Sequence, residues 1–175
     1  MKIIYSGIIA TIFSSIAVNA CPGSPASLHA KCEMSIYFPD STCEEVQEEI
    51  LYRGKHFDGW MDPHHNGSYQ ISSSTSDKVT GSRLTGDKLY TDLFDFEFTT
   101  SEEKSGCRVV ACSESQVNSV LDFSTNYCNL RMLYCNSNDG CQTVKHDMAY
   151  EENYGWGKCS QRTVSKCIIK TSNEF

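Results

Sequence analysis

The clearest helical pattern in the chain lies between Pro39 and Gly54. Ser41 or Thr42 can cap such a helix, and Glu45 stands three residues after Thr42, which is the spacing of a capping box. Gly54 is typical of a helix end. Apolar residues recur at the spacing of one helix face, at Cys43, Val46 and Ile50. The pattern therefore predicts one helix with a narrow apolar stripe.

After this helix the pattern changes to a period of two residues, which is typical of half-buried β-strands separated by Asn-, Asp- and Gly-containing turns. The predicted strands cover residues 68–74, 78–84, 88–99, 107–113, 122–134 and 143–151. Residues 21–31 are small and turn-prone and predict an irregular arm. The predicted fold class is α+β: one main helix packed on a curved antiparallel β-meander, stapled by disulfides and similar in outline to the cystatins.

The first twenty residues have the pattern of a signal peptide: Lys2, an apolar run over residues 3–18, and small residues before Cys21. We expect cleavage before Cys21, which leaves residues 21–175 as one domain. The run is marginal for spanning a bilayer core about 30 Å thick, and no later run is as long, so we expect no membrane insertion of the mature chain. Alternatively, Cys21 carries the lipid of a bacterial lipoprotein, which would leave an odd number of cysteines.

All ten cysteines follow the predicted cleavage site, and ten is an even number. In an oxidising compartment this count predicts up to five disulfides and a secreted, extracellular protein. Many pairings are possible, and the sequence does not select one of them. The cysteines are Cys21, Cys32, Cys43, Cys107, Cys112, Cys128, Cys135, Cys141, Cys159 and Cys167.

The charge balance of the chain is acidic, with 15 Lys and Arg against 22 Asp and Glu and a net charge of −7. Removal of Lys2 with the signal peptide makes the net charge −8, because one basic residue is lost. Nucleic-acid binding gains much of its affinity by neutralising phosphates with basic side chains. The balance therefore argues against nucleic acid and against anionic lipid as partners.

Residues 56–67 crowd imidazoles and carboxylates into a turn-rich stretch between the helix and the strands. Two or three of these side chains could converge on a metal ion, or an Asp could orient a His as a general base. The alternative is a solvated loop in which Trp60 plugs the edge of the core and Asn66-Gly67 closes a turn. The candidate binding residues are His56, Asp58, Trp60, Asp62, His64 and His65. Asn66 begins the sequon Asn66-Gly67-Ser68, a potential glycosylation site.

The sequence His146-Asp147-x-x-Tyr150 resembles the core motif of secreted phospholipases A2. That resemblance implies a His146 that activates water and an Asp147 that holds calcium. The sequence departs from the family because no cysteine pair precedes His146 and because Ala149 stands where the family has a cysteine. The alternative is a cross-strand pair on a half-exposed sheet.

Residues 122–135, together with residues 111–117 and the motifs Thr85-Gly86-Asp87 and Tyr90-Thr91-Asp92, resemble a family of small secreted cysteine-rich proteins of marine microalgae such as diatoms. The resemblance runs from about Cys32 to Cys141 and carries no established activity. It implies secretion by a eukaryotic microbe. The alternative is that these residues form sheet core and disulfide framework.

No motif in the chain has the spacing of a serine hydrolase, a zinc protease, a phosphate-binding loop or an EF-hand. We therefore predict no cofactor and no resident metal. The first hypothesis is an extracellular binding or interaction module for an unknown ligand, since aromatic residues are abundant. The alternative is a secreted hydrolase, metal-assisted or not, that uses the histidines and aspartates of residues 56–67. A third is a secreted toxin or effector.

Overall fold

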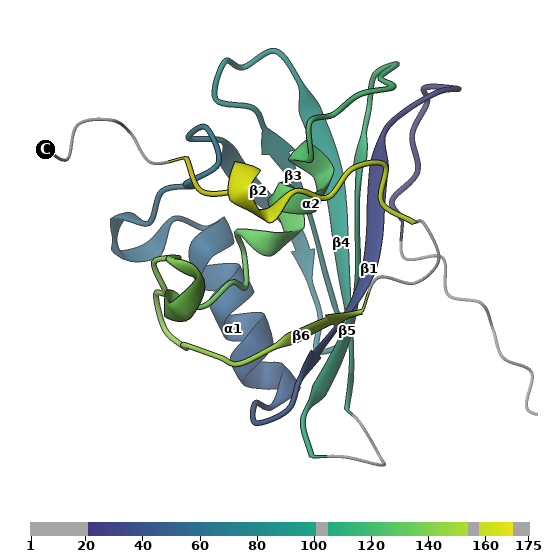
Figure 1. Cartoon of the computed structure of the whole chain (residues 1–175). Helices are drawn as coiled ribbons and strands as arrows, with labels where there is room; N and C mark the ends of the chain where they lie inside the picture. Colours follow the sequence, from purple (N-terminus) through teal and green to yellow (C-terminus); the bar gives the residue numbers. More distant parts are fainter. Residues whose placement is uncertain (1–20, 101–104, 154–157, 170–175) are drawn as a thin grey trace, which may run out of the picture.

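The computed structural model describes residues 21–100, 105–153 and 158–169. In this part of the chain, two α-helices cover one face of an open, six-stranded antiparallel sheet (Figure 1). The α+β prediction is confirmed, although a second helix joins the predicted one. No helix in these ranges is long and apolar enough to cross a bilayer.

The sheet has the strand order β2-β3-β4-β5-β1-β6, and every neighbouring pair is antiparallel. The strands are β1 (Lys31–Phe38), β2 (Ser68–Ser74), β3 (Lys78–Leu84), β4 (Thr91–Thr100), β5 (Cys107–Ser115) and β6 (Glu151–Asn153). The helices are α1 (Cys43–Gly54) and α2 (Thr125–Arg131), with short 3-10 turns η1 (Phe57–Gly59), η2 (Ser137–Asp139) and η3 (Val164–Lys166).

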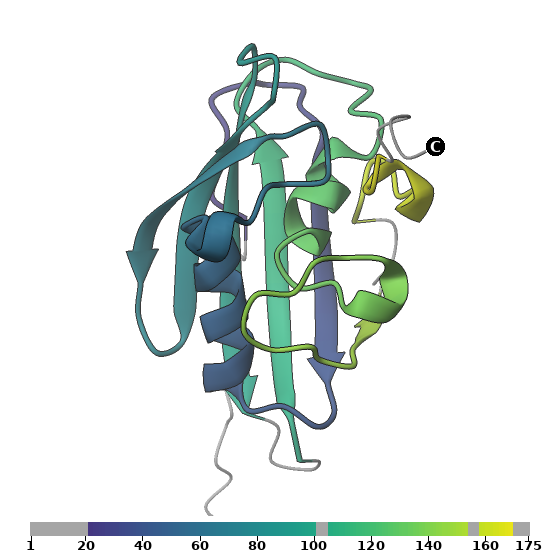
Figure 2. The same cartoon turned by 90° about the vertical axis from the view of Figure 1, so that its left-hand side faces the viewer.

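The core lies between the sheet and the two helices, which stand side by side on the same face (Figure 2). Alternate residues of β4 point into it, because successive side chains of a strand face opposite ways. These are Phe94, Phe96 and Phe98. Gly81 of β3 is required beside them, since a Cβ atom there would lie 2.5 Å from the ring of Phe94.

Helix α1 begins and ends where the sequence predicts. The Thr42 Oγ1 accepts a hydrogen bond from Glu45 N at 3.2 Å, and the Glu45 carboxylate accepts one from Thr42 N at 2.8 Å, which completes the capping box. Val46 and Ile50 are fully buried against the sheet. The boundaries of β2 and β3 also match their predictions.

The prediction of a strand over residues 122–134 is wrong, because the structure has helix α2 there. Every residue from 126 to 131 is buried, so the run lacks the polar face by which a helix is recognised. Strand β1 was missed although its sequence alternates in polarity, with Lys31, Glu33 and Ser35 facing outward between the buried side chains. Its buried positions are Cys32, Met34, Ile36 and Phe38.

The strand predicted over residues 143–151 is also wrong, apart from Glu151 at the start of β6. Residues 143–150 form an irregular segment whose backbone is held by a side chain of α1. The carboxylate of Glu49 accepts hydrogen bonds from the backbone N–H groups of Val144, Lys145 and His146 at 2.6–2.8 Å. The segment thus fixes its backbone without pairing to a strand.

All ten cysteines form disulfides, as predicted, and the described residues contain no free cysteine. Three bonds attach the irregular segments at 21–30 and 158–169 to the sheet or to α2, one joins α1 to β5, and one closes a short loop after α2. The pairs are Cys21–Cys112, Cys32–Cys159, Cys43–Cys107, Cys128–Cys167 and Cys135–Cys141. Such a framework is consistent with an oxidising compartment.

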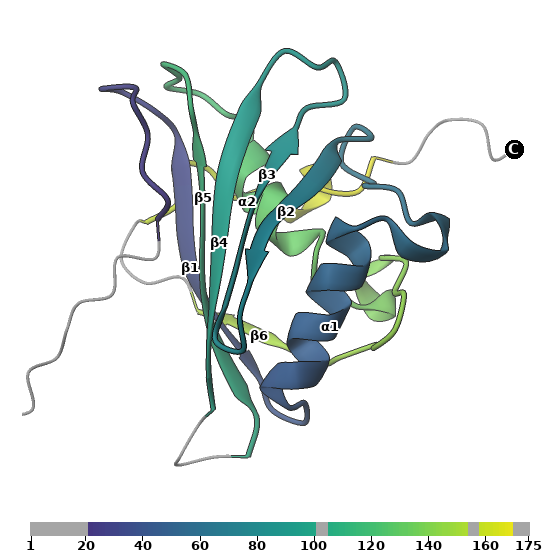
Figure 3. The same ribbon diagram turned by 180° about the vertical axis from the view of Figure 1, so that it is seen from behind.

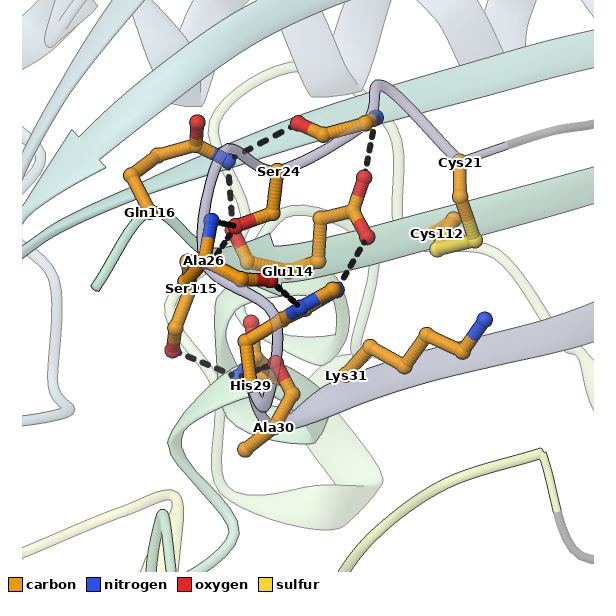
Figure 4. A network of polar contacts seen from close by, with 12 residues as sticks. Cys21, Ser24, Ala26, His29, Ala30, Lys31, Cys112, Glu114, Ser115 and Gln116 are labelled. Carbon is orange, nitrogen blue, oxygen red and sulfur yellow. Dashed lines mark hydrogen bonds and ion pairs between the residues drawn. A yellow bond between two sulfur atoms is a disulfide. The ribbon is translucent and has the colours of Figure 1, made fainter. Parts of the chain in front are cut away.

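The irregular arm, residues 21–30, crosses the end of β5 on the sheet face away from the helices (Figures 3 and 4). Glu114 fastens it: one carboxylate oxygen accepts a hydrogen bond from Gly23 N, and the other lies 2.9 Å from His29 Nε2. The other ring nitrogen, His29 Nδ1, lies 2.8 Å from the carbonyl oxygen of Ala26. Both ring nitrogens of His29 thus face oxygen atoms and help to hold the arm against β5.

Candidate ligand-binding cleft

Three adjoining cavities open at one end of the sheet, between the β3–β4 turn and the loop before α2. The turn (residues 85–90) and the loop (residues 116–124) lie at the top of Figure 1. We call the three cavities together the end cleft. Their volumes are about 330, 350 and 630 Å³, which is the size range of small-molecule sites. Thr125, the first residue of α2, lines all three.

The rim of the end cleft carries exposed apolar side chains. Tyr90 of the β3–β4 turn is 50% exposed, and Phe123 of the opposite loop is 62% exposed. Both line the first cavity, with Val117 and Leu121, which are also exposed. Exposed apolar groups gathered around a cavity are typical of a binding site rather than of an ordinary surface.

The floor of the first cavity contains a buried carboxyl group. Asp92 of β4 is only 2% exposed and accepts a hydrogen bond from Asn129 Nδ2 at 2.8 Å. Burial raises the pKa of Asp92, and hydrogen bonds from Asn129 and Ser115 oppose that rise. Asn129 also donates to Ser113 Oγ at 3.0 Å, which fixes the amide on β5. The floor is therefore polar and held in place by α2 and the sheet.

A second carboxylate at the cleft, Asp122, is already satisfied by the start of α2. Its two oxygens accept hydrogen bonds from Ser124 N at 3.2 Å and from Asn126 N at 3.2 Å and Asn126 Nδ2 at 3.0 Å. Asp122 thus positions the helix N-terminus.

The His64 ring lines the second and third cavities, and a hydrogen bond to the backbone of Lys166 fixes it. Its Nδ1 lies 2.9 Å from the carbonyl oxygen of Lys166, so Nδ1 carries the hydrogen and Nε2 presents a lone pair. Burial and the charge of Arg83 lower the pKa of His64 to about 4, although the bond to Lys166 opposes that change. His64 is therefore a neutral hydrogen-bond acceptor at neutral pH.

A buried ion pair supports the backbone around His64. Arg83 donates from Nε and Nη2 to Asp62 Oδ2 at 2.8 and 2.6 Å, and from Nη2 to the carbonyl oxygen of His64. Asp62 also accepts a hydrogen bond from His64 N at 2.9 Å. Gly67 is required here, since a Cβ atom would lie 2.3 Å from the guanidinium group. The pair holds one wall of the end cleft.

The candidate residues of segment 56–67 separate into two groups. Only His64 and His65 line the end cleft. His56 lies against Trp60 and its Nε2 accepts a hydrogen bond from Tyr69 N at 3.3 Å, while Asp58 is exposed on η1.

Trp60 is buried and donates from Nε1 to the carbonyl oxygen of Gln142 at 3.1 Å, which is the core-edge position that the loop interpretation predicts. Asn66, the sequon residue, is exposed in the turn closed by its N–H and the Asp62 carbonyl. Among the described residues, no group of three His, Cys, Asp or Glu side chains could hold a metal ion.

The three residues of the phospholipase-like motif have three different partners. His146 Nε2 lies 2.8 Å from Glu48 Oε2, Asp147 accepts hydrogen bonds from Ser137, and Tyr150 donates to Asp139. The motif lies in an irregular segment and not on a long helix.

Sequence reasoning missed the residues that form most of the end cleft: Tyr90, Asp92, Phe123, Thr125 and Lys166. The prediction of a strand over 122–134 assigned Phe123 to the sheet core and so concealed it. A usable signal was the apolar sequence Val120-Leu121-Asp122-Phe123 directly after a polar turn.

Comparison of the chain with protein-family models, with curated proteins and with solved structures gives no match.

Proposed function

We propose that the chain is an extracellular binding protein that takes up a small ligand in the end cleft. The carrying observation is the cavity series itself: an exposed apolar rim at Tyr90 and Phe123 stands above a buried polar floor at Asp92. Ligand sites commonly combine such a mostly apolar wall with a few convergent polar groups. The five disulfides support an oxidising compartment and hence secretion.

A fragment library screened against the ¹⁵N-labelled, oxidised protein tests this proposal. We expect binders to shift the amide signals of residues 85–92 and 115–125. Thr125→Trp should fill the position shared by all three cavities and weaken binding by about tenfold or more. Thr99→Trp, at an exposed site near the other end of β4, should not. A screen without binders, or binding that ignores Thr125→Trp, would contradict the proposal.

The hydrolase alternative stays a prediction. Of its candidate residues only His64 and His65 line the end cleft, and a histidine whose pKa is about 4 is a weak base at neutral pH. No contact in the described residues favours it over ligand binding.

A further inference from the structure

We infer that the ligand of the end cleft is a neutral oligosaccharide, an inference that rests on the proposed function. Three properties of the cleft lead to this class: exposed aromatic rings, fixed hydrogen-bond acceptors, and charged side chains of both signs.

The aromatic rings lie on opposite walls. Tyr90 lines the first and second cavities, and Phe123 lines the first and third. The face of an aromatic ring carries partial negative charge, and it attracts the slightly positive C–H groups on the flat face of a sugar ring. Two rings that each border two cavities suit a chain of sugar units better than a single compact ligand.

The polar lining requires a ligand that donates hydrogen bonds. Asp92 and the Nε2 of His64 accept and are held by Asn129 and by the Lys166 carbonyl, so neither can turn away. Hydroxyl and amide groups add further partners around them, at Thr85, Ser115, Asn118, Ser119, Thr125 and Ser165. A plain hydrocarbon chain would offer no donor to the acceptors Asp92 and His64 and would cover these polar groups without forming hydrogen bonds to them, which is unfavourable. Sugar hydroxyls both donate and accept.

The charged side chains along the cleft favour a neutral ligand over a ligand that carries a net charge. The first cavity has the carboxyl groups of Asp92 and Asp122, the second has Asp87 beside Arg83, and the third has Lys166. An extended ligand with one sign of charge therefore meets side chains of the same sign in part of the cleft. Arg83 is already paired with Asp62, and the net charge of −7 disfavours acidic polysaccharides.

Isothermal titration of the oxidised protein with cello-, laminari-, chito- and mannotetraose tests the inference, with an alginate tetramer, spermidine and dodecylamine as charged probes. We expect at least one neutral tetrasaccharide to bind and its affinity to fall about tenfold in Tyr90→Ala and in Phe123→Ala. Matched controls are Leu89→Ala, beside Tyr90 but outside the cavities, and Phe57→Ala, an exposed aromatic residue on η1. Both should bind like the wild type.

The outcomes separate the two proposals. Suppose that fragments or charged probes bind, that Thr125→Trp weakens their binding, and that no neutral tetrasaccharide binds. This result would overturn the oligosaccharide inference but would still support the end cleft as a ligand site. Tetrasaccharide binding that ignores Tyr90→Ala and Phe123→Ala would also overturn it. An absence of any binder would contradict both. Thermal unfolding of each variant verifies that it is folded.

Discussion

Glu49 and Asp62 are both buried carboxylates that pair with a buried arginine, yet their pKa values are displaced in opposite directions. Burial alone would raise the pKa of Glu49, but Arg53 and three backbone N–H groups lower it below its usual value. Burial raises the pKa of Asp62, and the opposing effects of Arg83 and of the His64 N–H do not reverse that rise.

The two ion pairs also connect different parts of the molecule. Arg53 donates to Glu49 at 2.6 Å and to the carbonyl oxygens of Met132 and Cys135 at 3.0 and 2.9 Å, so this pair joins α1 to the segment after α2 inside the core. Arg83 instead lines a cavity of the end cleft. The Glu49–Arg53 pair therefore joins elements inside the core, whereas the Asp62–Arg83 pair supports a wall of the end cleft.

The largest expected effect is that of Glu49→Gln. The amide leaves Arg53 without a buried anion and replaces one of the two acceptor oxygens that receive the backbone N–H groups of residues 144–146. We expect a loss of about 3–5 kcal/mol in the free energy of unfolding, measured by urea titration. Glu48→Gln, the neighbouring partly exposed carboxylate, should give no measurable change.

Asp62→Asn is the matched change in the second pair, and its expected cost is smaller, about 2–3 kcal/mol by the same titration. Burial already favours the neutral form of this carboxyl group, so a neutral amide is less costly there. Asp62→Asn should also weaken the binding of any ligand that contacts His64, because Asp62 accepts a hydrogen bond from the backbone N–H of His64 and so positions it. A loss equal to that of Glu49→Gln would remove the distinction between the two pairs.

The sequence predicted the elements whose pattern is local. The capping box at Thr42 and Glu45, the end of α1 at Gly54 and the limits of β2 and β3 depend on near neighbours in the chain, and the structure confirms them. Helix α2 could not be predicted in this way, since its residues are buried on all sides. Its polar residues have partners far away in the sequence, such as Asn126 with Ala30.

The end cleft was beyond prediction for a related reason. Tyr90, Phe123 and Lys166 meet only because β4, the loop before α2 and the segment tied down by Cys128–Cys167 converge at one end of the sheet. By contrast, the crowded segment 56–67 drew attention by composition, although most of its polar groups have structural partners. The composition of segment 56–67 therefore pointed to one wall of the end cleft, whereas the other walls are formed by residues that only the fold brings together.

The smallest expected effect is on the pH dependence of stability, and it concerns His64, beside the Asp62–Arg83 pair. Folded His64 has a pKa of about 4 against 6.5 for an ordinary histidine, so the unfolded chain binds more protons between these values. The contribution of His64 to stability therefore rises with pH over this window and falls as the pH is lowered, by about 2 kcal/mol between pH 7.5 and pH 5. The lowered pKa of Glu49 affects stability below about 4.5, the ordinary value for a glutamate, so Glu49 and His64 respond in different pH ranges.

His64→Asn should remove this part of the pH dependence. The Asn amide can keep the hydrogen bond to the Lys166 carbonyl but does not titrate. Urea titrations at several pH values should then give a flatter stability curve between pH 7.5 and pH 5 than the titrations of the wild type. An unchanged slope in His64→Asn would mean that water from the end cleft solvates the charged ring and that this wall is more open than the core around Glu49.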